Sequence, residues 1–186
     1  MKKEFLYYCT SNKFEQNTKQ IKTLELLINF YKSNFSNNIL LNIFRKKNKK
    51  LGFYLHGDVG VGKTMILDFF FNKLNMPKLR IHFNEFMINF HNFRQFKKNQ
   101  GKDNSLEGFV RNLKKKADFI YLDEFQVTNI VDAMILGKIF EIIFKNNIKV
   151  LISSNIKIED LYKDGLQRDQ FLPFINIIKN FCIEHE

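Results

Sequence analysis

Two kinds of hydrophobic pattern alternate along the chain. Short apolar runs that end in polar residues predict buried strands, and segments in which apolar residues recur every three or four positions predict amphipathic helices. The predicted strands cover residues 51–56, 79–83, 119–122, 150–155 and 181–185. Predicted helices cover residues 20–35, 64–74, 84–96, 158–164 and 172–181, with one more that ends near Lys116 and one that begins after Thr128 or Asn129.

The order of these elements predicts the fold. Strands alternate with helices along the chain, which is typical of a parallel sheet. Connections between parallel strands are right-handed, and the sheet needs helices on both of its faces. We therefore expect a three-layer α/β/α sandwich around a five-stranded parallel sheet.

Three local predictions accompany this fold. Residues 1–18 should be poorly ordered or loosely attached. The helix that follows Asn129 should bury a face that includes Ile130, Met134, Ile135, Ile139, Ile142 and Ile143. The short helix 158–164 should end near Gly165, where a left-handed backbone conformation costs little.

Length and composition fit one globular domain. The chain has 186 residues, of which 45% are hydrophobic, and this is enough for one substantial core. We predict an N-terminal helical extension over residues 1–45 and the main domain over residues 46–186. No apolar run approaches the length of a membrane span, and the N-terminus lacks the hydrophobic stretch of a secretory signal, so we expect a cytoplasmic protein.

Cysteine and histidine positions show no metal signature. Cys9 and Cys182 lie far apart in the sequence, and we expect free thiols in a reducing compartment. His56 and His82 fall at the ends of predicted strands near the candidate site, where we favour structural roles for both.

The residues between the first predicted strand and its helix carry a chemical motif. Residues 57–64, GDVGVGKT, match the phosphate-binding pattern G-x-x-x-x-G-K-[ST]. Glycines allow backbone conformations closed to other residues, so successive N–H groups can surround phosphate oxygens at a helix N-terminus. Lys63 would reach the β- and γ-phosphates and Thr64 would bind Mg²⁺. The predicted nucleotide-binding residues are Gly57, Asp58, Val59, Gly60, Val61, Gly62, Lys63 and Thr64; the alternative is a glycine-rich turn with an exposed lysine.

A carboxylate pair follows the third predicted strand. Residues 119–122 are apolar and lead into Asp123 and Glu124. At the carboxyl end of a central strand next to the strand that precedes the loop, Asp123 could bind Mg²⁺ through water, and Glu124 could polarise the attacking water. An acidic pair is often only a solvated strand end, but its position one β–α unit beyond the loop favours the functional interpretation.

Asn155 ends the fourth predicted strand and completes the candidate site. Its side chain could hydrogen-bond the γ-phosphate or the attacking water, although asparagine is also a common turn residue. Together with the loop and the acidic pair it would lie at the carboxyl ends of parallel strands, where open α/β sheets bind ligands.

The net charge of +11 raises the question of a nucleic-acid or membrane partner. Lysine supplies most of this charge, and lysine, asparagine, isoleucine and phenylalanine all have AT-rich codons, so genomic base composition is an alternative to selection for a polyanionic partner. The basic clusters 45–50 and 114–116 lack interleaved aromatic residues and resemble solvated linkers. We expect no nucleic-acid partner, and the lysines permit peripheral contact with a membrane without requiring it.

Five segments together resemble one family. They are LGFYLHGDVGVGKTMILDFFF, RIHFNEFMINFH, IYLDEFQVTNIVDAMILGKIFEIIF, VLISSNI and LYKDGLQRDQFLPFI. In this order they resemble the ZapE family of AAA+-type P-loop ATPases, which is known in bacterial cell division and, as the lactation-elevated type, in mitochondria. The resemblance covers residues 50–186 and depends mainly on residues 123–136 and on GLQR-x-x-FLP, because many families share the phosphate loop.

The resemblance implies an AAA+-like P-loop NTPase fold, ATP hydrolysis with Mg²⁺, a homo-oligomer and action on a protein client. That client is the tubulin-like division protein in bacteria, and in mitochondria the family acts in inner-membrane protein quality control. By matching position the resemblance assigns catalytic roles to Lys63, Glu124 and Asn155. It also implies that Arg168 acts as an arginine finger on a neighbouring subunit's γ-phosphate, the alternative being a surface arginine. Relatives continue beyond the fifth strand, so we expect the C-terminal lid to be absent.

Three functions remain open on the sequence. The leading hypothesis is a Mg²⁺-dependent ATPase that remodels or positions a protein partner, in cell division, in the cytoplasm or peripherally at the inner membrane. The second is a nucleotide-gated binding or scaffold module with weak hydrolysis. The third is a helicase-loader-like ATPase that binds DNA through its basic surface with a steep salt dependence.

Overall fold

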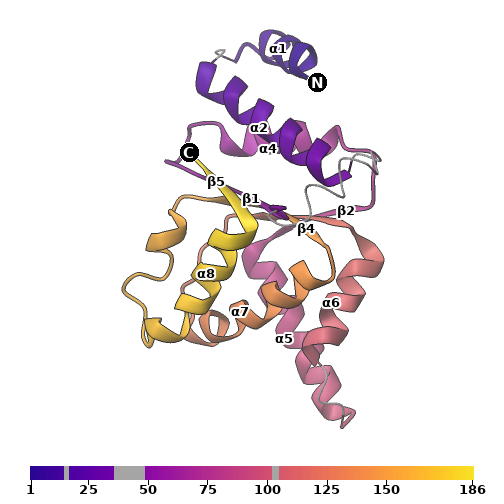
Figure 1. The fold of residues 1–186 in the computed structure, drawn as a ribbon, viewed down its shortest axis with the longest axis vertical. Helices are drawn as coiled ribbons and strands as arrows, with labels where there is room; N and C mark the ends of the chain where they lie inside the picture. The colour runs from indigo at the N-terminus through magenta and orange to yellow at the C-terminus, as the bar shows by residue number, and fades with distance from the viewer. Residues whose placement is uncertain (15–16, 36–48, 102–104) are drawn as a thin grey trace.

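A five-stranded parallel sheet forms the centre of the protein (Figure 1). The computed structural model describes residues 1–14, 17–35, 49–101 and 105–186, so the predicted domain boundary between residues 45 and 46 lies outside the described residues. The strands are β1 (Gly52–His56), β2 (Lys78–His82), β3 (Phe119–Asp123), β4 (Lys149–Ser154) and β5 (Cys182–His185), in the order β2-β3-β4-β1-β5. Every pairing between them is parallel, which confirms the predicted sheet and places the carboxyl ends of all these strands at one edge.

Helices cover both faces of the sheet (Figure 1). One layer contains α1 (Lys2–Ser11), α2 (Thr18–Phe35) and α4 (Lys63–Asn72), and the other contains α5 (Phe83–Asn99), α6 (Ser105–Lys116), α7 (Ile130–Lys145) and α8 (Leu172–Phe181). Two short 3-10 helices, η1 (Ile158–Asp160) and η2 (Arg168–Gln170), lie between β4 and α8. The predicted three-layer sandwich is therefore confirmed.

Alternate strand residues face the two helical layers, because successive side chains in a strand point to opposite faces. In β1, Phe53 and Leu55 join a buried cluster with α1, α2 and α4, whereas Tyr54 joins the cluster formed with α5 to α8. In β3, Tyr121 and Leu122 divide in the same way. Both faces of these strands are buried, which explains why they appear in the sequence as continuous apolar runs.

The strand order corrects one prediction about the site. We expected β3 to lie next to β1, but β4 separates them, with Leu151 paired to Phe53 and Val150 paired to Ile120. All six residues of β4 are buried, and a strand with no exposed position needs a neighbour on each side as well as helices on both faces. As a result, the end of β4 lies between the loop and the acidic pair.

The N-terminal segment is also more ordered than predicted. Residues 1–18 were expected to be loosely attached, but α1 occupies much of this range. Phe5 and Cys9, four positions apart on one face of α1, are each 1% exposed. The ring of Phe5 meets the ring of Phe69 on α4 at a centroid distance of 5.0 Å. Because these residues join the core, α1 is part of the packed helical layer.

Helix α7 begins as predicted but buries a different face. Asn129 caps it, since its side-chain oxygen accepts a hydrogen bond from the backbone N–H of Val131 at 2.7 Å. Of the predicted face, Ile139 and Ile143 are buried, whereas Met134 is 48% exposed. The residues that α7 buries are Ala133, Leu136, Ile139, Phe140, Ile143 and Phe144, because the helix packs against α8 as well as against the sheet.

The segment after β4 departs further from the prediction. The expected helix 158–164 is only the short η1, and the left-handed residue is Tyr162, with a φ of 54°, instead of Gly165. Gly165 is needed for another reason, because a Cβ there would collide with the ring of Tyr162.

The lysine cluster 114–116 forms the last turn of α6 and is not a linker.

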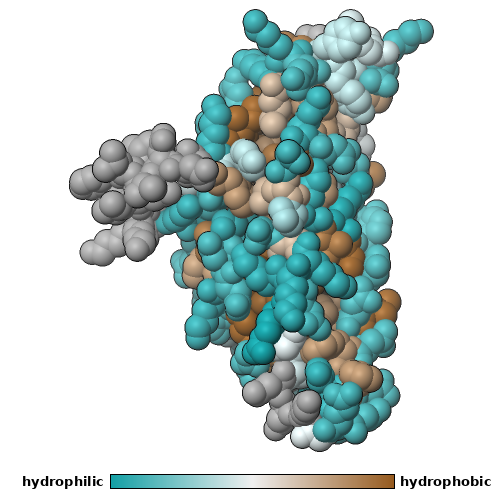
Figure 2. Space-filling model, turned by 90° about the vertical axis from the view of Figure 1, so that its right-hand side faces the viewer, coloured by the Kyte–Doolittle hydropathy of each residue, from teal (hydrophilic) through white to brown (hydrophobic). Residues whose placement is uncertain are grey.

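The surface is mainly hydrophilic on the face shown in Figure 2, with single hydrophobic residues scattered over it. Among the described residues, we find no helix with the length and apolar character needed to cross a membrane.

Candidate functional site

The loop between β1 and α4 adopts the backbone that its glycines predict. The φ angles of Gly57, Gly60 and Gly62 are 148°, 86° and 87°, all in the region that disfavours residues with a Cβ. Gly62 also packs closely against α2, since a Cβ there would lie 2.6 Å from Nε2 of Gln20. Gly62 is the N-cap of α4, so the loop ends at the positive end of a ten-residue helix.

Lys63 is held by neutral oxygens. Its Nζ donates hydrogen bonds to the backbone carbonyls of Gly57 and Asp58, each at 2.7 Å, and to Oδ1 of Asn155 at 2.9 Å. Burial lowers the pKa of Lys63, although the negative charges of Asp58 and Asp123 partly oppose this effect. Because no carboxylate of the described residues is hydrogen-bonded to this amine, the positive charge of Lys63 can act on an anionic ligand.

Asp123 lies at the end of β3 with donors around its whole carboxylate. Oδ1 accepts hydrogen bonds from the Tyr121 hydroxyl at 3.1 Å, from the backbone N–H of Glu124 at 3.1 Å, and from the Ser153 hydroxyl. Oδ2 accepts one from Nη2 of Arg80 at 2.5 Å. Burial acts to raise the pKa of Asp123, but the hydrogen bonds from Arg80, Ser153 and Tyr121 outweigh it and the net pKa is lowered. Asp123 is therefore ionised at neutral pH.

Glu124 has a strained backbone and an exposed side chain. Its φ is 54°, a left-handed conformation that a residue with a long side chain rarely adopts, and its side chain is 80% exposed. The backbone N–H of Glu124 donates to Oδ1 of Asp123 and, at 3.2 Å, to Oγ of Ser153. His82 at the end of β2 places Nδ1 3.7 Å from Oε2 of Glu124. The turn therefore directs the Glu124 carboxylate away from the core and towards His82.

One pocket of about 320 Å³ contains most of the predicted site residues. They come from three segments that the sheet brings together, namely the loop with the start of α4, the end of β3 and the end of β4. The lining residues are Val59, Gly60, Gly62, Lys63, Thr64, Met65, Asp123, Glu124, Ser153, Ser154 and Asn155. The structure thus places both predicted metal residues and three of the four predicted catalytic residues around one space.

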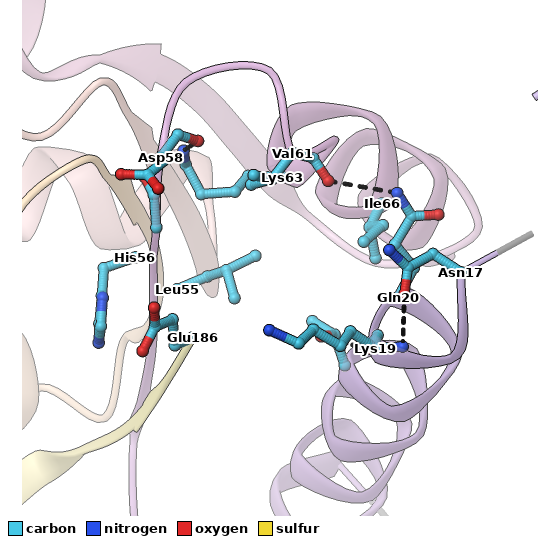
Figure 3. Close-up of a pocket in the computed structure, with 12 residues that line it drawn as sticks. Asn17, Lys19, Gln20, Leu55, His56, Asp58, Val61, Lys63, Ile66 and Glu186 are labelled. Carbon is cyan, nitrogen blue, oxygen red and sulfur yellow. Dashed lines mark hydrogen bonds between the residues drawn. The ribbon is translucent and has the colours of Figure 1, made fainter. Parts of the chain in front are cut away.

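A second pocket of about 290 Å³ lies on the other side of Lys63, between α2 and the end of β1 (Figure 3). It contains the remaining predicted loop residues, Gly57, Asp58 and Val61, together with the apolar side chain of Ile66. Figure 3 shows the amine of Lys19 extending from α2 into this space, opposite the side chains of His56 and Glu186. Lys63 lines both pockets, so they adjoin at the loop.

The participation of α2 was missed in the sequence. Gln20 donates a hydrogen bond from Nε2 to the backbone carbonyl of Val61 at 3.2 Å, across a sequence separation of 41 residues. Residues 1–45 were predicted to be an extension outside the main domain, and no local motif marks Gln20 or Lys19. Their position becomes visible only when the packing of α2 on α4 is known.

Arg80 and Ser153 were also missed, although they hold Asp123. Arg80 lies opposite Tyr121 in the register of β2 and β3, with its guanidinium 5.1 Å from the centre of that ring. The available signal was a charged residue between apolar neighbours in the middle of a predicted strand. Such a side chain must point to the face opposite Leu79 and Ile81.

Arg168 lies apart from both pockets. It begins η2, and its Nη2 donates a hydrogen bond to the backbone carbonyl of Glu159 at 2.7 Å, while its buried Nε has no hydrogen-bond partner within the described part of the chain. Arg168 lines neither pocket, so within one chain it does not join the other predicted catalytic residues.

Sequence comparison gives consistent matches. A family model described as AFG1-like ATPase matches residues 10–183. Lactation elevated protein 1 homolog B of Danio rerio is 40% identical over 141 residues, and the cell division protein ZapE of Escherichia coli K12 is 39% identical over 132 residues. Each alignment covers 70% of this chain but 28% and 35% of the respective relatives, so the match spans about a third of their length. The resemblance inferred from the five segments is confirmed.

Structural comparison supports the same fold. The crystal structure of the DnaC helicase loader matches with a TM-score of 0.57 at 15% identity, over 92% of each chain. At this identity the similarity shows the fold alone, which agrees with the predicted three-layer α/β architecture.

Proposed function

We propose that this chain, which belongs to the AFG1-like ATPase family, binds ATP at the loop between β1 and α4 and hydrolyses it. The observation that carries this proposal is the pocket in which Lys63, Thr64, Asp123, Glu124 and Asn155 meet. Lys63 supplies a cation for phosphate, and Thr64 and Asp123 supply a hydroxyl and a carboxylate for a metal ion. Glu124 supplies a carboxylate for the attacking water, and Asn155 supplies an amide that can hydrogen-bond the phosphate or this water.

The residues fit a triphosphate. The left-handed glycines turn the loop around the start of α4, where backbone N–H groups lack helical partners and favour anions. Lys63 would exchange its carbonyl and amide acceptors for phosphate oxygens, which gain more from its charge. Asn155 would then be free to hydrogen-bond either the phosphate or the attacking water.

The residues also fit Mg²⁺. Among the described residues, there is no group of three or more histidine, cysteine, aspartate or glutamate side chains that could hold a metal ion. A single carboxylate and a hydroxyl suit Mg²⁺, which usually keeps several waters and takes further ligands from phosphates. Thr64 and Asp123 are the residues that would hold it, and when bound it would offset negative charge on the phosphates.

Glu124 would orient the attacking water. Its side chain is exposed in the pocket, next to the ionised Asp123, while its backbone is fixed by two hydrogen bonds. A carboxylate in this position accepts a proton from water as the water attacks phosphorus.

The nucleoside would occupy the second pocket. The shared Lys63 joins this pocket to the phosphate site, and Ile66 and Leu55 give it an apolar surface against which a base could pack. Lys19 and Gln20 would then contact the nucleotide from α2 (Figure 3).

We extend the proposal to the assembly. The family match and the position of Arg168 outside the pockets support hydrolysis between subunits of a homo-oligomer, with Arg168 reaching the neighbouring site. The name of the Escherichia coli relative supports a role in cell division, with the ATPase remodelling or positioning a protein partner in the cytoplasm or at the membrane surface.

The experiment compares the wild type with Glu124→Gln. We expect the variant to bind MgATP with nearly unchanged affinity, measured by calorimetry, while steady-state hydrolysis falls by about 10² or more, because the water loses its proton acceptor. Glu85→Gln, at an exposed position on α5, is the matched control and should keep wild-type activity. Tight ATP binding by the wild type with hydrolysis no faster than the buffer background would refute an ATPase.

A further inference from the structure

Arg80 links the two elements that carry the metal residues. Its Nη1 lies 2.9 Å from Oδ2 of Asp68 on α4, and its Nη2 lies 2.5 Å from Oδ2 of Asp123 at the end of β3. Asp68 follows Thr64 by one helical turn, so both side chains lie on the same side of α4. The guanidinium therefore spans the gap between α4 and β3 beside the predicted metal residues.

Most of the acceptor capacity of the Asp123 carboxylate is already used. An ionised carboxylate accepts at about four lone-pair positions. Tyr121, Ser153 and the N–H of Glu124 all donate to Oδ1, and Arg80 donates to Oδ2. The donors on Oδ1 are neutral and belong to the rigid ends of β3 and β4. A cation that approaches Asp123 would therefore bind at Oδ2, next to the guanidinium of Arg80, which is the one positively charged donor to this carboxylate among the described residues and repels the cation.

Asp68 has more unused acceptor capacity than Asp123. Its Oδ1 is buried and has no hydrogen-bond partner among the described residues, while its Oδ2 already binds Arg80. A guanidinium can pair with both oxygens of one carboxylate. Oδ1 of Asp68 could thus accept the N–H that Arg80 directs to Asp123.

We propose that Arg80 is a positioning residue that competes with a divalent cation for Asp123, and that Asp68 receives the guanidinium when the cation binds. The inference rests on the proposed function in assigning Asp123 to the metal site. It links cation binding at β3 to the helix that begins with the phosphate loop. Arg80 also stabilises the charge of buried Asp123 whenever the cation is elsewhere.

The test is a titration of Mn²⁺ alone into the nucleotide-free chain, with free Mn²⁺ followed by electron paramagnetic resonance. We expect Arg80→Gln to bind Mn²⁺ about tenfold more tightly than the wild type, because a like charge next to the metal site is removed. Asp68→Asn should bind more weakly, because Arg80 has lost its alternative partner. Arg80→Lys keeps the charge without the planar fork and should remain close to the wild type.

The double variant Arg80→Gln with Asp68→Asn distinguishes a role of Asp68 as the alternative partner of Arg80 from a direct electrostatic effect of Asp68 on the cation. If Asp68 acts through Arg80, Asp68→Asn should change Mn²⁺ affinity much less in the Arg80→Gln background than in the wild type. A purely structural ion pair would instead weaken Mn²⁺ binding in both single variants. Thermal unfolding of each variant establishes that it is folded at the titration temperature.

The proposal is overturned if folded Arg80→Gln binds Mn²⁺ no more tightly than the wild type, or if neither protein binds it. These outcomes are independent of the proposed ATPase activity, which fails instead if the wild type does not bind or hydrolyse ATP.

Discussion

Ser153 shows how one side chain orders several residues at the end of the sheet. Its hydroxyl donates to Asp123 and accepts from the N–H of Glu124, while its backbone carbonyl accepts from Phe125 at 2.8 Å. These contacts hold Glu124 in its left-handed conformation, whose cost of about 1–3 kcal/mol must be met by surrounding interactions. Strain of this kind is common where a side chain must be aimed at a ligand, and here it aims the predicted water-orienting carboxylate.

Lys149 supports a prediction about stability and pH. This residue begins β4, is only 5% exposed, and its Nζ donates to the carbonyl of Asn147 at 2.9 Å. Burial, with the nearby charges of Lys114 and Lys49, lowers its pKa from 10.5 to about 8. Between these two values the unfolded chain binds more protons than the folded one, so Lys149 makes the free energy of unfolding rise with pH.

Lys149→Met should therefore stabilise the protein at pH 7 by about 1–2 kcal/mol, because no charge is buried in the variant. The advantage should shrink as the pH rises from about 8 towards 10.5. Urea unfolding at pH 7 and pH 10 measures both values, with Lys138→Met at an exposed position of α7 as the control. A variant that is less stable than the wild type at pH 7 would contradict the argument.

At the level of elements, the contact between β1 and β5 gives a second prediction. Gly52 pairs with Cys182, and a Cβ on Gly52 would collide with Sγ of Cys182. Gly52→Ala should lower the free energy of unfolding by about 1–3 kcal/mol, as overpacking does elsewhere. Adding Cys182→Ala removes the sulfur and should restore part of the loss, although Cys182→Ala alone leaves a cavity. Denaturant unfolding of all four proteins tests the coupling, and additive losses would show that the two residues do not clash.

The elements themselves were largely predictable because their signals are local. All five strands and the main helices after residue 18 follow from apolar periodicity, and Asn129 was identified as a cap from residue type and position. The place of β4 between β1 and β3 was not predictable, since strand order depends on how crossovers pack and not on any one segment. The buried face of α7 and the docking of α1 depend on partners that are distant in the sequence.

The residues of the candidate site likewise differ in how far the sequence alone predicts them. The loop residues and Asp123 were found because their chemistry requires a fixed spacing next to a strand end. Ser153 and Gln20 act through contacts across elements that leave no local pattern, whereas Arg80 left one weak signal, its charge between two apolar neighbours in a predicted strand. The roles of the loop residues, Asp123, Glu124, Asn155 and Arg168 all stay predictions until the variants are measured.

At the scale of the whole molecule, the position of Arg168 predicts complementation between subunits. Arg168→Ala should lose most activity because the γ-phosphate of the neighbouring site loses a cation, an effect of about 10³ or more for arginine fingers. Lys63→Ala should also be inactive, because it cannot hold the phosphates. Mixing the two proteins should restore part of the activity, since assemblies then contain intact sites that face an intact Arg168.

Size-exclusion chromatography with a slowly hydrolysed ATP analogue provides the accompanying measurement, and it should show a larger species than the nucleotide-free chain. A fully active Arg168→Ala variant would remove the residue from the mechanism. If both variants assemble but mixing them restores no ATPase activity, this result would argue against action of Arg168 across subunits.

The insertion of β4 between β1 and β3 has an electrostatic consequence. Neighbouring strands lie about 4.8 Å apart, so β1, which leads into the loop, and β3, which ends in Asp123, are separated by about twice that distance. The end of β4 between them carries the uncharged Ser153 and Ser154, and Asn155, which follows the strand, accepts a hydrogen bond from the Lys63 amine that a closer carboxylate would otherwise neutralise. Opposite charges can therefore coexist in one small space without cancelling each other, and both remain available to a ligand that carries negative phosphates and a positive metal.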